Sequence, residues 1–151
     1  MATNDDDDQV AAWRGVLFAQ DRVVRAIERD LADAGKVPLT SYDVLLELNA
    51  AEGRSLRMQD LGERVVLSRS RVSRLVDDLE HEGYVERLPD PEDGRATLAH
   101  LTTEGARAFR SAVPVYLAGI EEHFAQHLRP AELATIAKAL RRVYEAHDAV
   151  T

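Results

Sequence analysis

Apolar residues recur every three or four positions over most of this 151-residue chain, which is the spacing of amphipathic helices. The first such run extends from Val10 to Ala34 and ends at Gly35, which is a typical helix stop. A second helix is predicted from Thr40 to about Ala51. Its first residues resemble a capping box in which Asp43 replaces the usual glutamate. The N-terminal third of the chain is therefore expected to be helical.

The pattern is similar after residue 102. Thr102 is expected to cap a helix that runs to about Phe124 and that Pro114 bends. A last helix is predicted to begin at Pro130, because proline is well tolerated at the first helical position. Its apolar stripe consists of Leu133, Ile136, Leu140 and Val143.

Two shorter helices are predicted in the middle of the chain. Apolar residues from Met58 to Val65 mark the first, and Ser68 is placed to cap the second. The apolar residues of the second fall at helical spacing and share one face; they are Val72, Leu75, Val76 and Leu79. Two short helices with a tight connection form a helix-turn-helix.

The opposite face of the second short helix carries Ser70, Arg71, Ser73 and Arg74. Arginine forks suit phosphate oxygens and guanine edges, and serine hydroxyls bond to backbone or bases. Four arginines and no acid occur between residues 64 and 74, in a chain whose formal net charge is −8. This local reversal of charge favours DNA binding, and the alternative is a basic face that is only solvated.

Two short strands are predicted at Tyr84–Leu88 and Arg95–Leu101, after Gly83 ends the helix. They flank a turn that ends in Asp93-Gly94, so they form a hairpin beside the helix-turn-helix, a wing. Arg95 follows the turn glycine, where it can enter the minor groove. The alternative is an ion pair of Arg95 with Asp90 or Asp93.

This central region resembles the MarR family of winged helix-turn-helix regulators. The match covers about residues 39 to 105 and is carried by LSRSRVSRLVD (67–77), LEHEGYVER (79–87), DPEDGR (90–95) and Leu101-Thr102. The resemblance implies a homodimeric regulator, usually a repressor, that a small phenolic or anionic molecule releases from a near-palindromic operator. Glu92 and Arg71 depart from the family pattern: a basic residue is frequent at the first position and a small or hydroxyl residue at the second.

The expected fold is mainly α with a small β element (α+β): a winged helix-turn-helix with long dimerisation helices at both ends. Residues 1–9 are predicted to be an acidic disordered segment and 10–151 a single domain. The winged helix spans about 39–103, and the dimerisation helices about 10–35 and 103–147. The DNA-binding residues taken from the pattern and the resemblance are Ser68, Arg69, Ser70, Arg71, Ser73, Arg74 and Arg95.

The terminal helices carry more apolar surface than a small winged helix can cover, which favours a homodimer. Two-fold symmetry would place the recognition helices about 34 Å apart, one turn of DNA, on an inverted-repeat operator. The expected function is sequence-specific DNA binding by a ligand-responsive repressor. The alternative is a winged-helix module for protein contacts without operator recognition.

The resemblance places an effector site between the dimerisation helices and the winged helix. Arg14 is a candidate partner for the carboxylate of an aromatic effector, with Trp13 or Tyr42 on its ring. The alternative is that Trp13 belongs to the dimer core and Arg14 to the surface. The candidate effector residues are Trp13, Arg14, Phe18, Tyr42 and Asp43.

Other classes of function find little support. The sequence has no cysteine, no Gly-rich phosphate loop and no Gly-x-Ser-x-Gly elbow, so no enzyme, thiol sensor or cofactor site is expected. His123 and His127 have a spacing that can hold zinc on a helix, with His147 as a possible third ligand, but ordinary surface histidines are the expectation. Without a long apolar run or signal sequence, the expected location is the cytoplasm.

Overall fold

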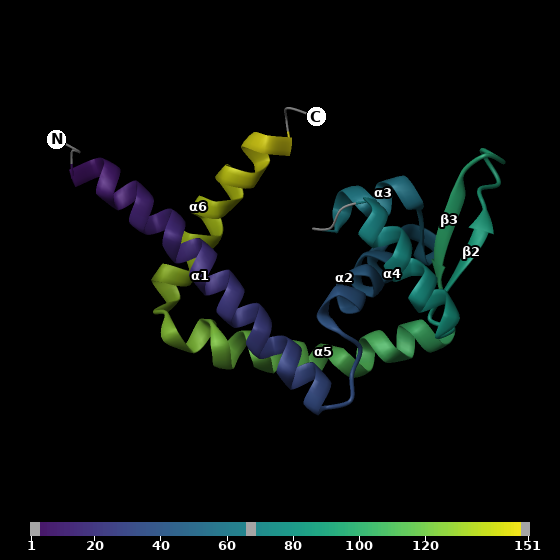
Figure 1. Ribbon diagram of the computed structural model, residues 1–151, viewed down its shortest axis with the longest axis horizontal. Helices are drawn as coiled ribbons and strands as arrows, with labels where there is room; N and C mark the ends of the chain where they lie inside the picture. Colours follow the sequence, from purple (N-terminus) through teal and green to yellow (C-terminus); the bar gives the residue numbers. More distant parts are fainter. Residues whose placement is uncertain (1–3, 66–68, 149–151) are drawn as a thin grey trace. The chain divides into compact units, whose positions relative to one another are not determined.

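The computed structural model describes residues 4–65 and 69–148 (Figure 1). It divides into two compact units: the winged unit, Ile27–Tyr116, and the terminal unit, formed by the chain before and after it. The elements follow in the order α1 (Asn4–Asp33), α2 (Leu39–Ala50), the 3-10 helix η1 (Glu52–Arg54), β1 (Ser55–Arg57), α3 (Met58–Arg64), α4 (Arg69–His81), β2 (Val85–Pro89), β3 (Thr97–Leu101), α5 (Thr103–His123), the 3-10 helix η2 (Ala125–His127) and α6 (Pro130–Asp148).

The mainly helical class and the winged helix-turn-helix are confirmed. The three strands form one antiparallel sheet in the order β1-β3-β2. Val85 lies opposite Leu101 at one end of the β2–β3 hairpin, and Pro89 lies opposite Thr97 at the other. Figure 1 shows this hairpin extending beside α4. Strand β1 was not predicted, because three residues are too short to show an alternating pattern.

The core of the winged unit is built from the faces that the periodicity predicted. Each helix of the helix-turn-helix buries its apolar stripe against α2 and the sheet. The fully buried large side chains are Leu31, Val44, Leu45, Leu48, Leu61, Val72, Val76, Leu79, Val85 and Leu101. The recognition helix is therefore held by packing, which leaves its polar face available.

The N-terminal helix starts earlier than predicted. Residues 1–9 were expected to be disordered, but α1 already includes Asn4 to Asp8. The reason is electrostatic: carboxylates in the first turn of a helix interact favourably with the free amides and the positive end of the helix dipole. The acidic run is a good start for a helix and not an interruption of it.

The predicted capping box at Thr40 is wrong. Helix α2 begins at Leu39, Pro38 occupies the N-cap position, and no side chain caps the helix. The Pro38 carbonyl accepts the first helical hydrogen bond from the Tyr42 amide at 2.9 Å. The φ of Pro38, −56°, suits the entry to a helix, so the helix starts one residue before Thr40.

The end of α4 and the start of α5 are as predicted. Gly83 has a φ of 79°, its amide donates to the Glu80 carbonyl, and the Tyr84 amide donates to the Leu79 carbonyl. This is a Schellman motif, which needs a residue with positive φ. The Thr102 hydroxyl accepts the Gly105 amide at 3.0 Å and donates to the Gly83 carbonyl at 2.7 Å. Thr102 thus caps α5 and ties it to the end of α4.

The last helix also begins as predicted, at Pro130, where the Glu132 carboxylate accepts the Arg129 amide at 2.8 Å. Helix α5 ends at His123, one residue before the expected Phe124. Within residues 4–65 and 69–148, no helix is both long and apolar enough to cross a membrane.

Candidate nucleic-acid interface

Helix α4 divides into two faces, as its sequence predicted. Val72, Val76 and Leu79 are buried and Leu75 is partly buried. The side chains of the other face are all exposed; they are Ser70, Arg71, Ser73 and Arg74. Because the buried face fixes the rotation of the helix, the polar face is presented in one direction as a ready surface for a ligand.

Arg71 and Arg74 have no hydrogen bond or ion pair within the described part of the chain, although acidic residues are abundant in this protein. Their guanidinium groups therefore keep their full donor capacity for an external acceptor. Planar five-donor groups of this kind bind phosphate oxygens or guanine edges through paired hydrogen bonds. The two arginines give the exposed face of α4 the chemistry of a DNA-binding surface.

Two of the predicted residues belong to the N-terminal turn of α4. Ser68 lies outside the described residues, and its predicted capping role stays a prediction. Arg69 is the first residue of α4, and its side chain is likewise not described. Residues at the start of a recognition helix are those that usually reach base edges, so both remain candidates.

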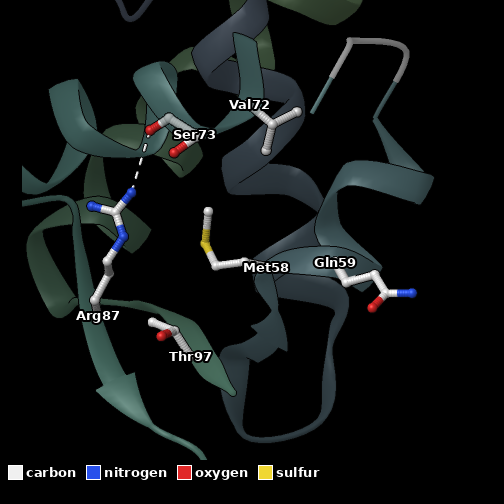
Figure 2. A pocket seen from close by; sticks show the side chains of 6 residues that line it. All are labelled: Met58, Gln59, Val72, Ser73, Arg87 and Thr97. Carbon is white, nitrogen blue, oxygen red and sulfur yellow. Dashed lines mark hydrogen bonds between the residues drawn. The ribbon is translucent and has the colours of Figure 1, made fainter. Parts of the chain in front are cut away.

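Arg87 of β2 braces α4 against the wing. Its guanidinium lies 2.7 Å from the Asp77 carboxylate and donates to the Ser73 carbonyl at 3.3 Å, and its backbone amide donates to Glu80 at 3.0 Å. Figure 2 shows the guanidinium pointing toward Ser73, with Met58 beside it. The hydrogen bonds and the ion pair fix the angle between the recognition helix and the hairpin.

A cavity of about 360 Å³ lies beside this brace, and Ser73 of the polar face of α4 is among the residues that line it (Figure 2). Its lining combines polar and apolar groups from the start of α3, from α4 and from both wing strands. The residues around it are Met58, Gln59, Val72, Ser73, Arg87 and Thr97. The helix-turn-helix and the wing thus meet at a concave surface, next to the exposed arginines.

A second arginine braces the tip of the wing. The Nε of Arg57 lies 2.6 Å from Oδ2 of Asp90, whose residue is only 6% exposed. The other oxygen of Asp90 accepts the Glu92 amide at 2.9 Å. The Glu92 amide first, and then the Arg57 guanidinium, lower the pKa of Asp90 from its ordinary value. Asp90 is therefore an anion whose two oxygens bind Arg57 and the backbone of the turn.

Arg95 is exposed at the wing, where its sequence position predicted it. The alternative of a local ion pair is not what the structure has. Asp90 is paired with Arg57, and Asp93 accepts the Arg95 backbone amide at 3.1 Å. Within the described residues, the Arg95 guanidinium enters no ion pair. Its charge is available on the same unit as Arg71 and Arg74.

The roles of Arg57 and Arg87 were missed by the sequence analysis. Both residues lie in segments whose local pattern points only to strands or to the start of a helix. Their partners are 33 and 14 residues away along the chain, at Asp90 and Ser73. No short motif encodes contacts over such separations, so these braces became visible only in three dimensions.

The predicted effector residues divide between the two units. Trp13, Arg14 and Phe18 lie on α1 in the terminal unit, where the Arg14 guanidinium is 5.1 Å from the centre of the Phe18 ring. Tyr42 and Asp43 lie on α2 in the winged unit. Trp13 and Phe18 are well exposed, at 60% and 49%. The effector site stays a prediction.

Tyr42 belongs to an aromatic cluster, and the charge of Asp43 acts on one member of that cluster, Tyr116. Tyr42 is buried, and its ring centre lies 5.2 Å from that of Phe109 and 4.4 Å from that of Tyr116. Burial, and then the neighbouring Glu47, raise the pKa of Asp43 above its ordinary value. Burial and the charge of Asp43 likewise raise the pKa of Tyr116. Tyr42 is thus engaged in packing, and the Asp43 carboxylate is poorly solvated.

The two histidines with possible zinc spacing do not share an α-helical face. His123 is the last residue of α5, and His127 ends the 3-10 helix η2. Among residues 4–65 and 69–148, no three His, Asp or Glu side chains lie together as a metal site requires. The prediction of a helical histidine pair is therefore wrong, because the α-helix stops between them.

The arrangement of these elements defines a class of protein. A helix-turn-helix whose second helix presents arginines and serines, with a hairpin wing that presents another arginine, is the architecture of winged helix-turn-helix DNA-binding proteins. Residues 36–96 match the model of the MarR family. This match places residues 36–96 in the MarR family, and the resemblance stated from the motifs of that region is confirmed.

Solved structures of similar proteins share the whole fold. The chain is 29% identical to AbsC, a MarR family transcriptional regulator from Streptomyces coelicolor, with a TM-score of 0.86 and coverage of 99% of this chain and 98% of AbsC. It is 27% identical to Sco3205, another such regulator from S. coelicolor, solved in complex with DNA. The TM-score there is 0.85, and 97% of this chain and 89% of Sco3205 are covered.

A curated relative matches over a shorter stretch. The uncharacterised HTH-type transcriptional regulator YkoM of Bacillus subtilis is 33% identical over 96 residues, which are 64% of this chain. The chain spans 60% of the length of YkoM. All three relatives are described as transcriptional regulators, and the MarR family is not a family of enzymes.

Proposed function

We propose that this protein is a transcriptional regulator that binds double-stranded DNA through α4 and the wing. The observation that carries the proposal is the exposed face of α4, where Arg71 and Arg74 have no acidic partner within the described residues although the chain has a net charge of −8. The match of residues 36–96 to the MarR family and the DNA complex of Sco3205 support it.

The proposed contacts fall into two groups. Arginines that reach phosphates supply affinity, and residues near the start of the recognition helix supply sequence choice. Arg74 is assigned to phosphate, and Arg95 to the minor groove. The residues assigned to the reading face are Ser68, Arg69, Ser70, Arg71 and Ser73. Glu92 at the wing tip would repel phosphate, so the tip itself is kept away from the backbone.

The protein is proposed to act as a homodimer. The terminal unit exposes apolar side chains on α1, α5 and α6, and stripes of this length are rarely left in water. A two-fold dimer would bring two recognition helices to half-sites about 34 Å apart. An inverted-repeat operator is the matching DNA geometry.

Repression relieved by a small aromatic anion is the proposed regulation. Arg14 would bind the carboxylate of the effector, with Trp13, Phe18, Tyr42 and Asp43 around it. The exposed Arg14 guanidinium and its aromatic neighbour Phe18 support this role. The effector would favour a dimer in which the recognition helices have the wrong separation for adjacent grooves. Because Tyr42 is packed against Phe109 and Tyr116, its participation requires a rearrangement of this cluster.

The test of DNA recognition is to bind fragments of the source genome to the purified protein at two salt concentrations and to sequence those that are retained. An enriched inverted repeat with half-sites one turn apart is expected. Arg74→Ala should weaken binding to all DNA and reduce the salt slope by about one, whereas Arg71→Ala or Ser70→Ala should lose about 1–3 kcal/mol at particular bases. Arg107→Gln, on α5 and paired with Glu104, is the control.

Retention without any preferred sequence would contradict operator recognition and favour the protein-interaction module instead. If the three variants bind DNA as tightly as the wild type, the assignment of Arg74 to phosphate and of Ser70 and Arg71 to the reading face is contradicted. For the effector, aromatic carboxylic acids are titrated against the DNA complex of the wild type and of Arg14→Ala. Arg25→Ala, whose side chain is paired with Asp21 on the same helix, is the control. Release that does not depend on Arg14 would contradict the proposed site.

A further inference from the structure

We propose that Arg57 is a positioning residue for DNA binding: by holding Asp90, it sets the wing so that Arg95 reaches the minor groove. This inference rests on the proposed DNA-binding function. The carrying observation is the contact of 2.6 Å between the Arg57 Nε and Oδ2 of the buried Asp90, which joins the helix-turn-helix to the wing tip.

The sheet order makes this contact a long-range brace. Arg57 is the last residue of β1 and lies opposite Leu98 of the middle strand β3. Asp90 follows the last residue of β2, on the other side of β3. Neighbouring strands are about 4.8 Å apart, so the two side chains together span about 10 Å across the middle strand. The Arg57–Asp90 pair therefore joins the two outer strands near the free end of the hairpin.

Asp90 passes this restraint on to the turn. One of its oxygens accepts the Glu92 amide, and its own amide donates to the Ala96 carbonyl at 3.0 Å. The Ala96 amide in turn donates to the Asp93 carbonyl at 2.9 Å. Arg95 lies inside this set of bonds, so a restraint on Asp90 limits where the Arg95 side chain can point.

Arg57 also occupies the N-cap position of α3, and no side chain caps this helix. Serine, threonine or aspartate at such a position stabilises a helix by about 1 kcal/mol relative to a residue that cannot cap. Here the N-cap residue is Arg57, and its side chain binds Asp90 of the wing instead of capping α3. This choice is consistent with a role in orienting the hairpin relative to the helix-turn-helix.

A direct DNA contact by Arg57 is a weaker explanation. Its Nε is bonded to Asp90, and a terminal nitrogen lies 4.0 Å from Glu92. The hydrogen bond to Asp90 and the charge of Asp90 raise the pKa of Arg57, and Asp93 and Asp60 add further negative charge around it. The guanidinium is thus engaged with the carboxylates of the wing, chiefly that of Asp90.

The test is a double-mutant cycle of Arg57→Gln and Arg95→Ala, with affinity measured on the selected operator by fluorescence anisotropy. Each single variant is expected to lose about fivefold or more, the range for one specific contact. The double variant should bind no more weakly than Arg95→Ala alone, because the brace acts through Arg95. Additive losses would overturn the inference, since they would mean that Arg57 acts on DNA or on the fold independently of Arg95.

Asp90→Asn provides the same test from the other partner with little change of shape, which keeps the inference testable if Arg57→Gln fails to fold. It too should lose affinity in the wild-type background and none in the Arg95→Ala background. Arg57→Lys, which keeps the charge, should recover part of the loss. The control is Arg107→Gln, which removes the same charge at a residue of α5 that is paired with Glu104 and lies outside the wing.

DNA binding by the wild-type protein distinguishes a failure of this inference from a failure of the proposed function. If the wild type binds no DNA, the proposed function fails and the brace has no role in it. If the wild type binds its operator and the cycle is additive, the function stands and the inference alone is wrong. Unfolding curves of every variant, recorded beside the binding data, show whether a loss of affinity follows a loss of folded protein.

Discussion

Apolar side chains are buried in the winged unit and exposed in the terminal unit. Nearly all the buried apolar residues lie between Ile27 and Ala112, whereas Val10, Trp13, Leu117 and Val143 are all more than half exposed. The winged unit thus forms a core of its own within one chain. The terminal helices have equally regular apolar stripes and no comparable core. Equal periodicity therefore does not mean equal burial, and the difference points to a surface that a second chain would cover.

The largest expected effect tests the self-sufficient core. Leu79 of α4 is fully buried, so Leu79→Ala should lower the free energy of unfolding by about 2–5 kcal/mol, through lost transfer energy and a cavity. Leu88→Ala, at a leucine of the wing that is 37% exposed, is the control and should change much less. Urea denaturation followed by circular dichroism measures both. Equal effects would mean that the winged unit has no core of its own.

The second prediction addresses the exposed stripe. Tyr144→Ala on α6, at a side chain that is 55% exposed, should weaken self-association by at least about 2 kcal/mol, because large aromatic side chains dominate buried interfaces. Sedimentation equilibrium gives the dissociation constant. Leu46→Ala removes a leucine of the winged unit that is 37% exposed, and it should leave association unchanged. A Tyr144→Ala protein that associates as tightly as the wild type would contradict the proposed interface.

The third prediction uses one substitution with opposite signs in the two units. A Cβ on Gly105 would lie 2.0 Å from the Tyr84 carbonyl oxygen, so the backbone must shift and Gly105→Ala should destabilise by about 1–3 kcal/mol. Nothing lies within 4 Å of the corresponding atom on Gly15 in the middle of α1. Gly15→Ala should therefore stabilise by about 0.5–1 kcal/mol through helix propensity. Thermal unfolding measures the stability of both variants. A change of melting temperature with the same sign in both would contradict the predicted difference between the two units.

The smallest effect concerns the half-buried Asp43. Its pKa is raised in the folded protein, so folding favours the protonated form and the carboxylate costs stability above its unfolded-state pKa. Asp43→Asn should therefore raise the free energy of unfolding at pH 7, and the gain should shrink as the pH falls toward 3. Glu47→Gln, which removes the charge facing Asp43, should have the same sign. A loss of stability at pH 7 would mean that Asp43 has a favourable partner.

The sequence alone determined most of the helices and the class of site. The rotation of α4 followed from the spacing of Val72, Val76 and Leu79, because a helix can bury only one such stripe. The ends at Gly83 and Thr102 followed from local backbone chemistry, which depends on a few neighbouring residues. The exposure of Arg71 and Arg74 on α4 was predicted from the same spacing.

Only the tertiary structure decided how these pieces are fixed to one another. Strand β1, the Arg87 brace and the Arg57–Asp90 pair all join segments that are distant along the chain. Their local sequences are compatible with several partners, and packing selects one. The start of α2 at Leu39 is a smaller case, since the sequence predicted a cap at Thr40 and the folded chain has Pro38 at the N-cap position. Local patterns determine elements because their interactions are local; the orientation of the wing depends on contacts that only the folded chain brings together.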